Sequence, residues 1–479
     1  MTLLAHHTGP RFGRAGLDEG LRRLDGGLRR LGDWLSTHQS AIRRLQWAVV
    51  GVYAALLVAP TFLPAPVRTS HIWTHLTLFA QFAFWGLWWP FVLLSMALVG
   101  RAWCGLLCPE GALSEWASER GLGRSTPHWI KWRGWPFVAF ALTTIYGQMV
   151  SVYQYPKPAL VVLGGSTVAA MVVGVLYGRQ KRVWCRFLCP VTGVFGLLSK
   201  LAPFHFRVDA QAWGQAPRHS PGQPNYVNCA PLVPIRTMKG ASACHMCGRC
   251  SGFKGAIALS RRSPMEEIVR FSAEPKPWDT VLILFGLMGV AAGAFHWTGS
   301  DLYVAVKQAL AERLVGSPLA FMLEPVLPWW LLTNYPAQND AMTPLDGIVL
   351  VGYMLGAALL LGGVLAACLA LATRVAGPWS GRVFHHLAQG LIPLAGCGVF
   401  LGLSAITVTM LRGEGFSLGL VGPLRVALLA GAGAWALLFG WRILGLYVES
   451  LARRIAATIP YLAAVGAGVA SWALLFWPV

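Results

Sequence analysis

The sequence predicts an all-α polytopic membrane protein with about nine transmembrane helices and one cysteine-rich insert. Three observations predict this class. Hydrophobic residues make up 55% of the 479 residues and charged residues only 12%, whereas soluble domains carry about 25% charged residues. Nine apolar runs are long enough to cross a bilayer. Most cationic residues, and eight of the ten cysteines, lie in segments between alternate runs.

Each apolar run offers about 20 residues, the length that the hydrocarbon core of a bilayer requires. The first run follows a 44-residue basic segment, and no small-residue cleavage site comes after it. We therefore interpret it as a span and not as a signal peptide. The predicted spans are roughly 45–64, 76–100, 135–153, 158–177, 278–297, 345–373, 383–411, 417–441 and 456–477.

The placement of Lys and Arg predicts the orientation. If the N-terminus is cytoplasmic, the inside segments are 1–44, 101–134, 178–277, 374–382 and 442–455, and they hold 33 Lys and Arg against 5 outside. Cytoplasmic loops carry such an excess, and the ratio is still 18 to 5 without the long segment. Nine spans then put the C-terminus outside. The net charge of +20 thus reflects orientation and attraction to anionic lipid, and no motif supports nucleic-acid binding.

These boundaries divide the chain into four parts. We expect a basic cytoplasmic segment at 1–44, a four-helix membrane unit at 45–177, a cytoplasmic insert at 178–277 and a C-terminal membrane unit of about five helices at 278–479. In the first part, two arginine pairs repeat at seven residues between leucines, which is typical of a basic amphipathic helix on the inner leaflet. The alternative is a solvated tail. The residues concerned are Leu21, Arg22, Arg23, Leu24, Leu28, Arg29, Arg30 and Leu31.

The insert holds the strongest motif, Cys244-x2-Cys247-x2-Cys250. The cytoplasm is reducing, so clustered cysteines there are more often metal ligands than disulfides. This spacing opens the bacterial ferredoxin motif, in which three thiolates bind three corners of one [4Fe–4S] cluster. Lys254 occupies the position of the fourth ligand. We interpret Cys229, the remaining cysteine of the insert outside a paired motif, as the fourth ligand. A Cys3His zinc site with His245 or His219 stays open.

A second motif occurs twice. Arg101-x-Trp103-Cys104-x2-Leu107-Cys108-Pro109 recurs 81 residues later as Arg182-x-Trp184-Cys185-x2-Leu188-Cys189-Pro190. Each copy follows a span that runs from outside to inside, and Cys-x3-Cys-Pro is also the end of the ferredoxin motif. Two duplicated hairpins that face each other across a pseudo-twofold axis bring four thiolates together. We therefore expect Cys104, Cys108, Cys185 and Cys189 to bind one further cluster, with a redox-active dithiol pair or a structural turn as alternatives. Cys368 and Cys397 lie in spans and are expected to be core residues.

On these motifs, residues 45–260 resemble the membrane-bound [4Fe–4S] ferredoxin-type electron-transfer proteins of the NapH, NosR and FixG (CcoG) group. The resemblance implies cytoplasmic [4Fe–4S] clusters held by the paired-motif cysteines and by Cys244, Cys247 and Cys250. It also implies that electrons pass between the quinone pool and a partner. The chain departs from the group because it has no full second ferredoxin motif, and its C-terminal part consists of helices rather than an immunoglobulin-like domain.

The sequence thus predicts a multi-pass protein of the bacterial inner membrane that relays single electrons from the quinol pool to a redox partner protein, as a component of a quinol dehydrogenase. We expect two [4Fe–4S] clusters, a bound quinone and no haem. Two alternatives stay open. One is a copper reductase or maturation factor for a respiratory metalloenzyme, and the other is a transporter with a structural or sensory cluster.

Three weaker patterns have ordinary explanations. His71 and His75 stand at helical spacing near the outer end of the second span, with His296 near the end of the fifth, but we expect interfacial side chains rather than a metal site. His385 and His386 are neighbours on one helix and cannot both bind a haem. Glu115 and Glu119 follow the first Cys-x3-Cys-Pro motif and are expected on a solvated helix face, with quinol protons as the alternative.

Overall fold

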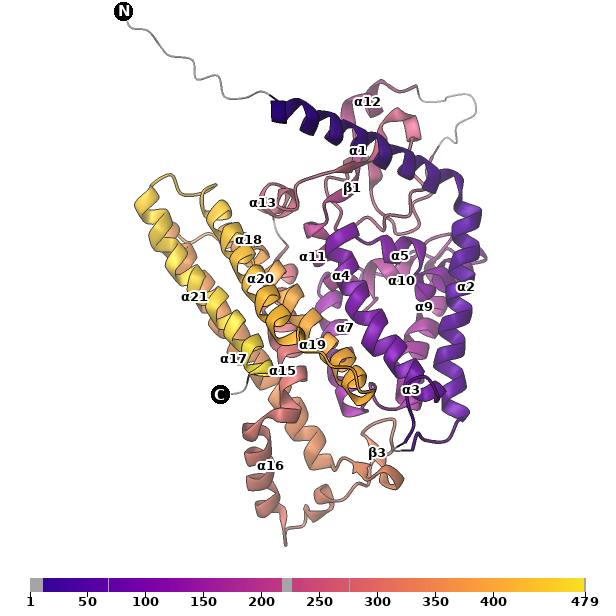
Figure 1. The fold of residues 1–479 in the computed structure, drawn as a ribbon, viewed down its shortest axis with the longest axis vertical. Coiled ribbons are helices and arrows are strands. Elements are labelled where there is room, and N and C mark those ends of the chain that lie inside the picture. The colour runs from indigo at the N-terminus through magenta and orange to yellow at the C-terminus, as the bar shows by residue number, and fades with distance from the viewer. Residues whose placement is uncertain (1–11, 68, 218–225, 275, 478–479) are drawn as a thin grey trace, which may run out of the picture.

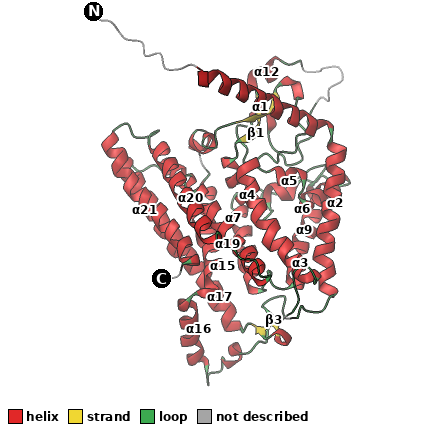
Figure 2. Ribbon diagram, viewed as in Figure 1, coloured by secondary structure: helices red, strands yellow, loops and turns green. Residues whose placement is uncertain are grey.

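The computed structural model describes residues 12–67, 69–217, 226–274 and 276–477, and helices make up most of it (Figure 2). Before the insert, two π-helical stretches join α3 to α4 and α8 to α9, so that each pair forms one continuous rod. The elements here are α1 (Phe12–Thr37), α2 (Gln39–Val58), α3 (Leu76–Gln81), α4 (Trp89–Val99), α5 (Ala102–Leu106), α6 (Pro109–Glu119), α7 (Trp135–Met149), α8 (Pro156–Ala159) and α9 (Gly165–Tyr177).

The insert contains a small antiparallel sheet, which the sequence did not predict. Its two strands pair with Phe206 opposite Leu259, and both side chains are buried in the core of the insert. Figure 1 shows the insert at one end of the helical bundle. The elements of residues 178–277 are α10 (Val183–Phe187), α11 (Thr192–Leu198), β1 (Phe204–Val208), α12 (Ala210–Gln215), β2 (Ile257–Arg261), α13 (Glu266–Val269) and the start of α14 (Pro277–Val281).

The C-terminal unit continues from α14 through a π-helical stretch into α15. A short hairpin, β3 with β4, and α16 lie at the end of the molecule opposite the insert (Figure 1). The elements are α15 (Ala291–His296), α16 (Asp301–Leu314), β3 (Asn334–Tyr335), β4 (Asp340–Ala341), α17 (Pro344–Ala376), α18 (Gly381–Gln389), α19 (Ile392–Gly413), α20 (Val421–Leu444) and α21 (Leu451–Phe476).

Within the described residues, eight helical segments are long and apolar enough to cross a membrane. They coincide with eight of the nine predicted spans, which confirms the all-α polytopic fold class. Their bounds are Gln39–Phe62, Leu76–Val99, Pro156–Tyr177, Pro277–Gly299, Pro344–Ala376, Gly381–Gly413, Val421–Leu444 and Leu451–Phe476.

The ninth predicted span, 135–153, is a shorter helix. α7 has 15 residues, or about 22 Å at 1.5 Å per residue. Before it, the Trp132 ring packs against Trp278 at the insert end of the bundle, with 5.0 Å between ring centroids. At its other end, the Met149 carbonyl accepts a hydrogen bond of 2.8 Å from Thr333 N, next to β3. α7 and its flanking residues therefore connect the two ends of the bundle.

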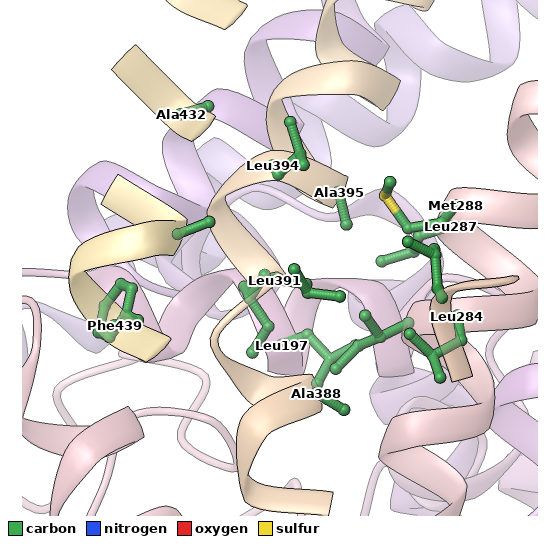
Figure 3. Close-up of a cluster of buried hydrophobic side chains, with 14 of the residues drawn as sticks. Leu197, Leu284, Leu287, Met288, Ala388, Leu391, Leu394, Ala395, Ala432 and Phe439 are labelled. Atoms are coloured by element: carbon green, nitrogen blue, oxygen red, sulfur yellow. The ribbon is translucent and has the colours of Figure 1, made fainter. Parts of the chain in front are cut away.

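One apolar core joins the insert end to the C-terminal helices. Leu284, Leu287 and Met288 of the π-helical stretch meet Leu391 and the start of α19, and Leu197 of α11 packs into the same cluster (Figure 3). Because lipid is as apolar as these side chains, close packing rather than exclusion from water stabilises such contacts in a bilayer.

The basic helix α1 packs against the insert, which differs from the interpretation as a helix on the inner leaflet alone. Leu35 is buried in the core of the insert, with Leu28 packed against it. Asp33 accepts a hydrogen bond of 2.9 Å from Ser251 Oγ. Leu24 and Leu31 stay exposed. One apolar face of α1 is thus occupied by protein, and the seven-residue pattern could not distinguish that surface from lipid.

Candidate functional site

The two copies of Cys-x3-Cys-Pro fold in the same way. In each copy the first cysteine lies on a five-residue helix, α5 or α10. The amide of the second cysteine then donates to the carbonyl of the motif tryptophan, at 2.9 Å from Cys108 to Trp103 and 3.0 Å from Cys189 to Trp184. A proline follows each second cysteine. The sequence repeat is therefore a structural repeat, and it presents two cysteines in the same local geometry each time.

Arginines cross between the two copies. Arg182 of the second copy donates a 2.7 Å hydrogen bond to the carbonyl of Cys104 in the first. Arg101 of the first copy donates at 2.9 Å to Thr192 Oγ1, which donates at 2.8 Å to the carbonyl of Cys185. Each arginine thus holds the cysteine helix of the other copy. This reciprocal pattern is the expected signature of a pseudo-twofold axis between the copies.

All four motif cysteines line one cavity of about 880 Å³ within the bundle. Burial is the main cause that raises the pKa of the Cys185 thiol to about 12. The charges of Glu110 and Cys104 act in the same direction, whereas Arg182 and Arg101 oppose the shift. Among the described residues, no three His, Cys, Asp or Glu side chains are placed to hold a single metal ion. A cubane is larger than one ion and takes one thiolate at each of four corners. The number and chemistry of the donors therefore fit a [4Fe–4S] cluster.

The insert cysteines form a second group. The loop that carries Cys244, Cys247 and Cys250 turns through positive φ angles at Met246 (54°) and Gly248 (75°). A Cβ on Gly248 would lie 2.3 Å from the Cβ of Leu35, so glycine lets this loop pack closely against α1.

Cys229 approaches this loop from another segment. Arg182 N donates at 2.8 Å to the carbonyl of Ala230, and Lys181 Nζ donates at 3.2 Å to that of Cys229. These bonds attach the segment to the second Cys-x3-Cys-Pro copy. Burial raises the pKa of the Cys250 thiol, and the charges of Cys244, Cys247 and Cys229 raise it further. Cys229 thus lies within electrostatic reach of the other three, as the proposed ligand set requires.

His245, the alternative ligand for a zinc site, is buried and is one of the residues that line the large cavity. Burial lowers its pKa strongly, and Arg101, Arg182 and Arg186 lower it further. The ring therefore lies among cations on the side of the paired motifs. His219, the other alternative, lies outside the described residues.

The two cysteine groups touch at Gly105, which the sequence analysis missed. A Cβ at this position would lie 2.0 Å from the carbonyl oxygen of His245 and 2.8 Å from Cys247 N. Only glycine permits this approach without a shift of the backbone. The second motif copy has Arg186 at the equivalent position. This glycine-to-arginine difference, one of three mismatches between the two copies, was the available signal.

Helix α2 runs past both groups. Gln39 Nε2 donates at 3.0 Å to the Cys247 carbonyl, and Gln46 Nε2 donates at 2.9 Å to the Gly105 carbonyl. Seven residues of helix span about 10 Å. The insert group and the paired-motif group are therefore stacked along α2, with the second group further into the bundle.

A buried carboxylate connects the groups electrostatically. Glu115 accepts hydrogen bonds from Arg182 Nε at 2.7 Å and from Arg249 Nη1 at 2.6 Å, and both Glu115 and Arg182 are buried. Burial raises the pKa of Glu115, but the two guanidinium groups outweigh this, and the pKa is lowered overall. The predicted solvated face was therefore wrong for Glu115. It holds for Glu119, which forms a partly exposed 3.0 Å ion pair with Arg43.

The remaining candidates have structural partners. His71 Nδ1 lies 3.1 Å from a carboxylate oxygen of Glu414, and His75 caps the start of α3 rather than lying on a helix with His71. His296 bonds to the Ser471 carbonyl. The two ring nitrogens of His386 bond to Tyr447 and to the Ile268 carbonyl. Cys368 and Cys397 pack against the apolar core.

Comparison with known proteins agrees with the repeat. A family model described as a 4Fe-4S binding domain matches residues 81–128 and 161–209, and each match contains one Cys-x3-Cys-Pro copy. A relative described as "Putative electron transport protein YccM", from Escherichia coli (strain K12), is 23% identical over 234 residues. The match covers 44% of this chain and 64% of that relative. No solved structure matches the chain.

These findings confirm the predicted resemblance to membrane-bound ferredoxin-type electron-transfer proteins. They support an iron–sulfur cluster as the cofactor of a multi-pass membrane protein.

Proposed function

We propose that the chain relays single electrons from the quinol pool, through two [4Fe–4S] clusters, to a redox partner on the cytoplasmic side of the bacterial inner membrane. One observation carries the proposal. The helix that carries Cys104 meets the backbone of the Cys244–Cys250 loop at Gly105, and the four paired-motif cysteines line an apolar cavity inside the helical bundle. This stacking gives electrons a short path from the depth of the membrane to the insert.

The ligand assignment follows the two groups. Cys104, Cys108, Cys185 and Cys189 would hold one cluster, and Cys229, Cys244, Cys247 and Cys250 the other. A bound [4Fe–4S] cluster accepts and releases one electron at a time. The chain supplies burial and positive charge, since Arg182 contacts the backbone of Cys104 and Arg101 reaches that of Cys185 through Thr192. Nearby cations favour the more negative reduced form and so raise the reduction potential.

The cavity supports a quinol as the donor. Its volume of about 880 Å³ and its mainly apolar lining suit a lipid-soluble ring compound. Tyr53, Glu110 and Ser166 supply polar groups beside the cysteines, and Ser166 Oγ donates a 2.5 Å hydrogen bond to Glu110. Leu142 of α7 and Val161 beside α9 line the cavity and are 62% and 41% exposed. The gap between these helices is thus the proposed entrance from lipid.

Adjacent residues on α9 test the cavity. Ala169 lines it, whereas Val168 points away and is 60% exposed. In the Ala169→Phe variant the larger side chain would occupy part of the cavity. We expect a short-chain quinol to reduce the clusters of this variant about tenfold more slowly, since a tenfold change corresponds to about 1.4 kcal/mol of lost quinol binding. Val168→Phe should leave the rate within about twofold. Equal rates in both variants would remove the cavity as the donor site.

The cluster count tests the relay itself. Purified protein should contain about eight iron and eight sulfide per chain. The reduced protein should show two interacting paramagnetic centres by electron paramagnetic resonance. About four iron atoms and one centre would reduce the proposal to a single cluster, and zinc in place of iron would overturn it.

A further inference from the structure

We propose that a cationic groove on the insert, lined by Cys229, is the docking site for a small acidic electron-carrier protein. This inference rests on the proposed relay function and adds the place and the surface chemistry of the partner. The groove has a volume of about 480 Å³. Its described lining consists of Lys181, Trp213, Tyr226, Val227, Cys229, Leu232, Val233, Pro234, Ile235, Arg236, Phe253 and Lys254.

Cys229 connects this surface to the eight cysteines proposed as cluster ligands. It lines the groove, whereas the other seven candidate ligands are absent from the described lining. The paired-motif cysteines line the cavity inside the bundle instead. The eight candidate ligands thus face the cavity of the proposed membrane donor at the paired motifs, and the surface of the insert at Cys229. Because electron transfer slows steeply with distance, a carrier seated over Cys229 has the shortest route to the insert group.

The charge of the surface selects an acidic partner. Lys181, Arg236 and Lys254 line the groove. The sequence contains seven Lys and Arg but no Asp or Glu between Asp209 and Glu266. Such a one-sign field attracts a partner of opposite charge and speeds its association.

The apolar part of the lining favours a protein over an anionic lipid surface. Tyr226 is 75% exposed, and the Trp213 ring packs against Phe253 with 5.4 Å between centroids, beneath the amine of Lys254. Exposed aromatic side chains beside cations are typical of the centre of protein–protein interfaces. In the transfer, the cluster of the insert loses one electron, the carrier gains it, and no bond forms or breaks.

The test uses the full-length protein in detergent and an acidic plant-type [2Fe–2S] ferredoxin as probe. Binding of the oxidised ferredoxin is followed by surface plasmon resonance. Electron transfer across the docking site is followed by stopped flow in the reverse direction, from reduced ferredoxin to the oxidised protein. We expect Arg236→Glu with Lys254→Glu to raise the Kd by about tenfold or more and to slow association equally. Lys131→Glu, an exposed cation outside the groove, should change neither by more than about twofold. For the unsubstituted protein, association should slow as salt rises.

Reduction by methyl viologen, a small cationic donor, separates the two proposals. The double variant should react with it at least as fast as the unsubstituted protein, which shows that its clusters are intact. Ferredoxin binding that is unchanged in the double variant, or insensitive to salt, would overturn the docking site while the relay stands. Loss of binding to phosphatidylglycerol vesicles in the double variant, with ferredoxin binding unchanged, would assign the groove to lipid and also overturn it. Protein without iron would instead remove the relay.

Discussion

At the residue scale, the Glu115 carboxylate is the counter-charge of two arginines, the buried Arg182 and the partly buried Arg249. We predict that Glu115→Gln lowers the free energy of unfolding by about 3–5 kcal/mol, because it leaves the Arg182 guanidinium buried without its counter-charge. Glu119→Gln, on the same helix, should cost about 0–1 kcal/mol, since its ion pair with Arg43 is exposed. Thermal unfolding in detergent, with iron content as a second readout, measures both. Equal effects would show that the buried network is not stabilising.

The same carboxylate predicts a pH dependence. A carboxyl group whose pKa is lowered in the folded state contributes stability that is present above its unfolded pKa of about 4.3. That contribution is lost as the pH falls through the lower folded value. The difference in stability between the unsubstituted protein and Glu115→Gln should therefore be constant at neutral pH and shrink below about pH 4. A difference that grows on acidification would contradict the assignment.

Cys229 is the least secure ligand by sequence spacing and is directly testable. We predict that Cys229→Ser loses about four iron atoms per chain, as should Cys244→Ser, because a cubane needs all four thiolates. Cys368→Ser, in the apolar core, should lose none. Iron and sulfide analysis measures this. If Cys229→Ser keeps its iron and His245→Ala loses it, the ligand is the histidine.

The sequence predicted residues whose spacing is typical of cluster ligands. It missed residues whose roles depend on contacts between segments far apart in the chain. Cys244, Cys247 and Cys250 were recognisable because a two-residue gap is specific for cluster loops. Gly105 and Thr192 were not recognisable. Gly105 permits a close approach between segments far apart in the chain, and Thr192 accepts a hydrogen bond from the distant Arg101 and donates one to the nearby Cys185 carbonyl. Glu115 was misjudged because its arginine partners lie 67 and 134 residues away.

At the element scale, hydropathy placed the long helices and was less informative outside them. Spans such as Pro344–Ala376 are set by length and apolar content alone. The two-stranded sheet of the insert was not predictable, since each strand has five residues and they lie about 50 residues apart in the chain. Helix α1 was predicted as amphipathic, but its surface partner depends on the insert.

The repeated element gives a prediction of its own. Arginines cross between the copies and all four cysteines line one cavity, so the copies should share one cluster. We predict that Cys104→Ser and Cys185→Ser each lose about four iron atoms per chain, and that the double variant loses no more than either one. Additive loss would mean two separate sites, and no loss would make these motifs dithiols or structural turns.

At the scale of the whole molecule, the paired motifs constrain how the chain crosses the membrane. Arg101 follows α4, and Arg182 follows α9. Arg101 reaches Thr192 beside the second copy and Arg182 reaches Cys104, so both motifs lie at the same end of the bundle. The chain between them must cross the membrane an even number of times. We take the rod from α8 to α9 as one crossing, and we therefore predict that α7 supplies the other despite its 15 residues.

This parity argument leads to a topology prediction. With α7 as a crossing, the basic insert follows the fourth span and lies on the side of the N-terminus, where 33 of the Lys and Arg residues collect against 5 opposite. A green fluorescent protein fused after Gly178 should fluoresce, and alkaline phosphatase fused there should be inactive. The reverse should hold at Asp340, in strand β4 of the hairpin at the opposite end. If α7 does not cross, both results at Gly178 invert. The insert would then lie in an oxidising compartment, where its thiols would be expected to form disulfides rather than bind clusters.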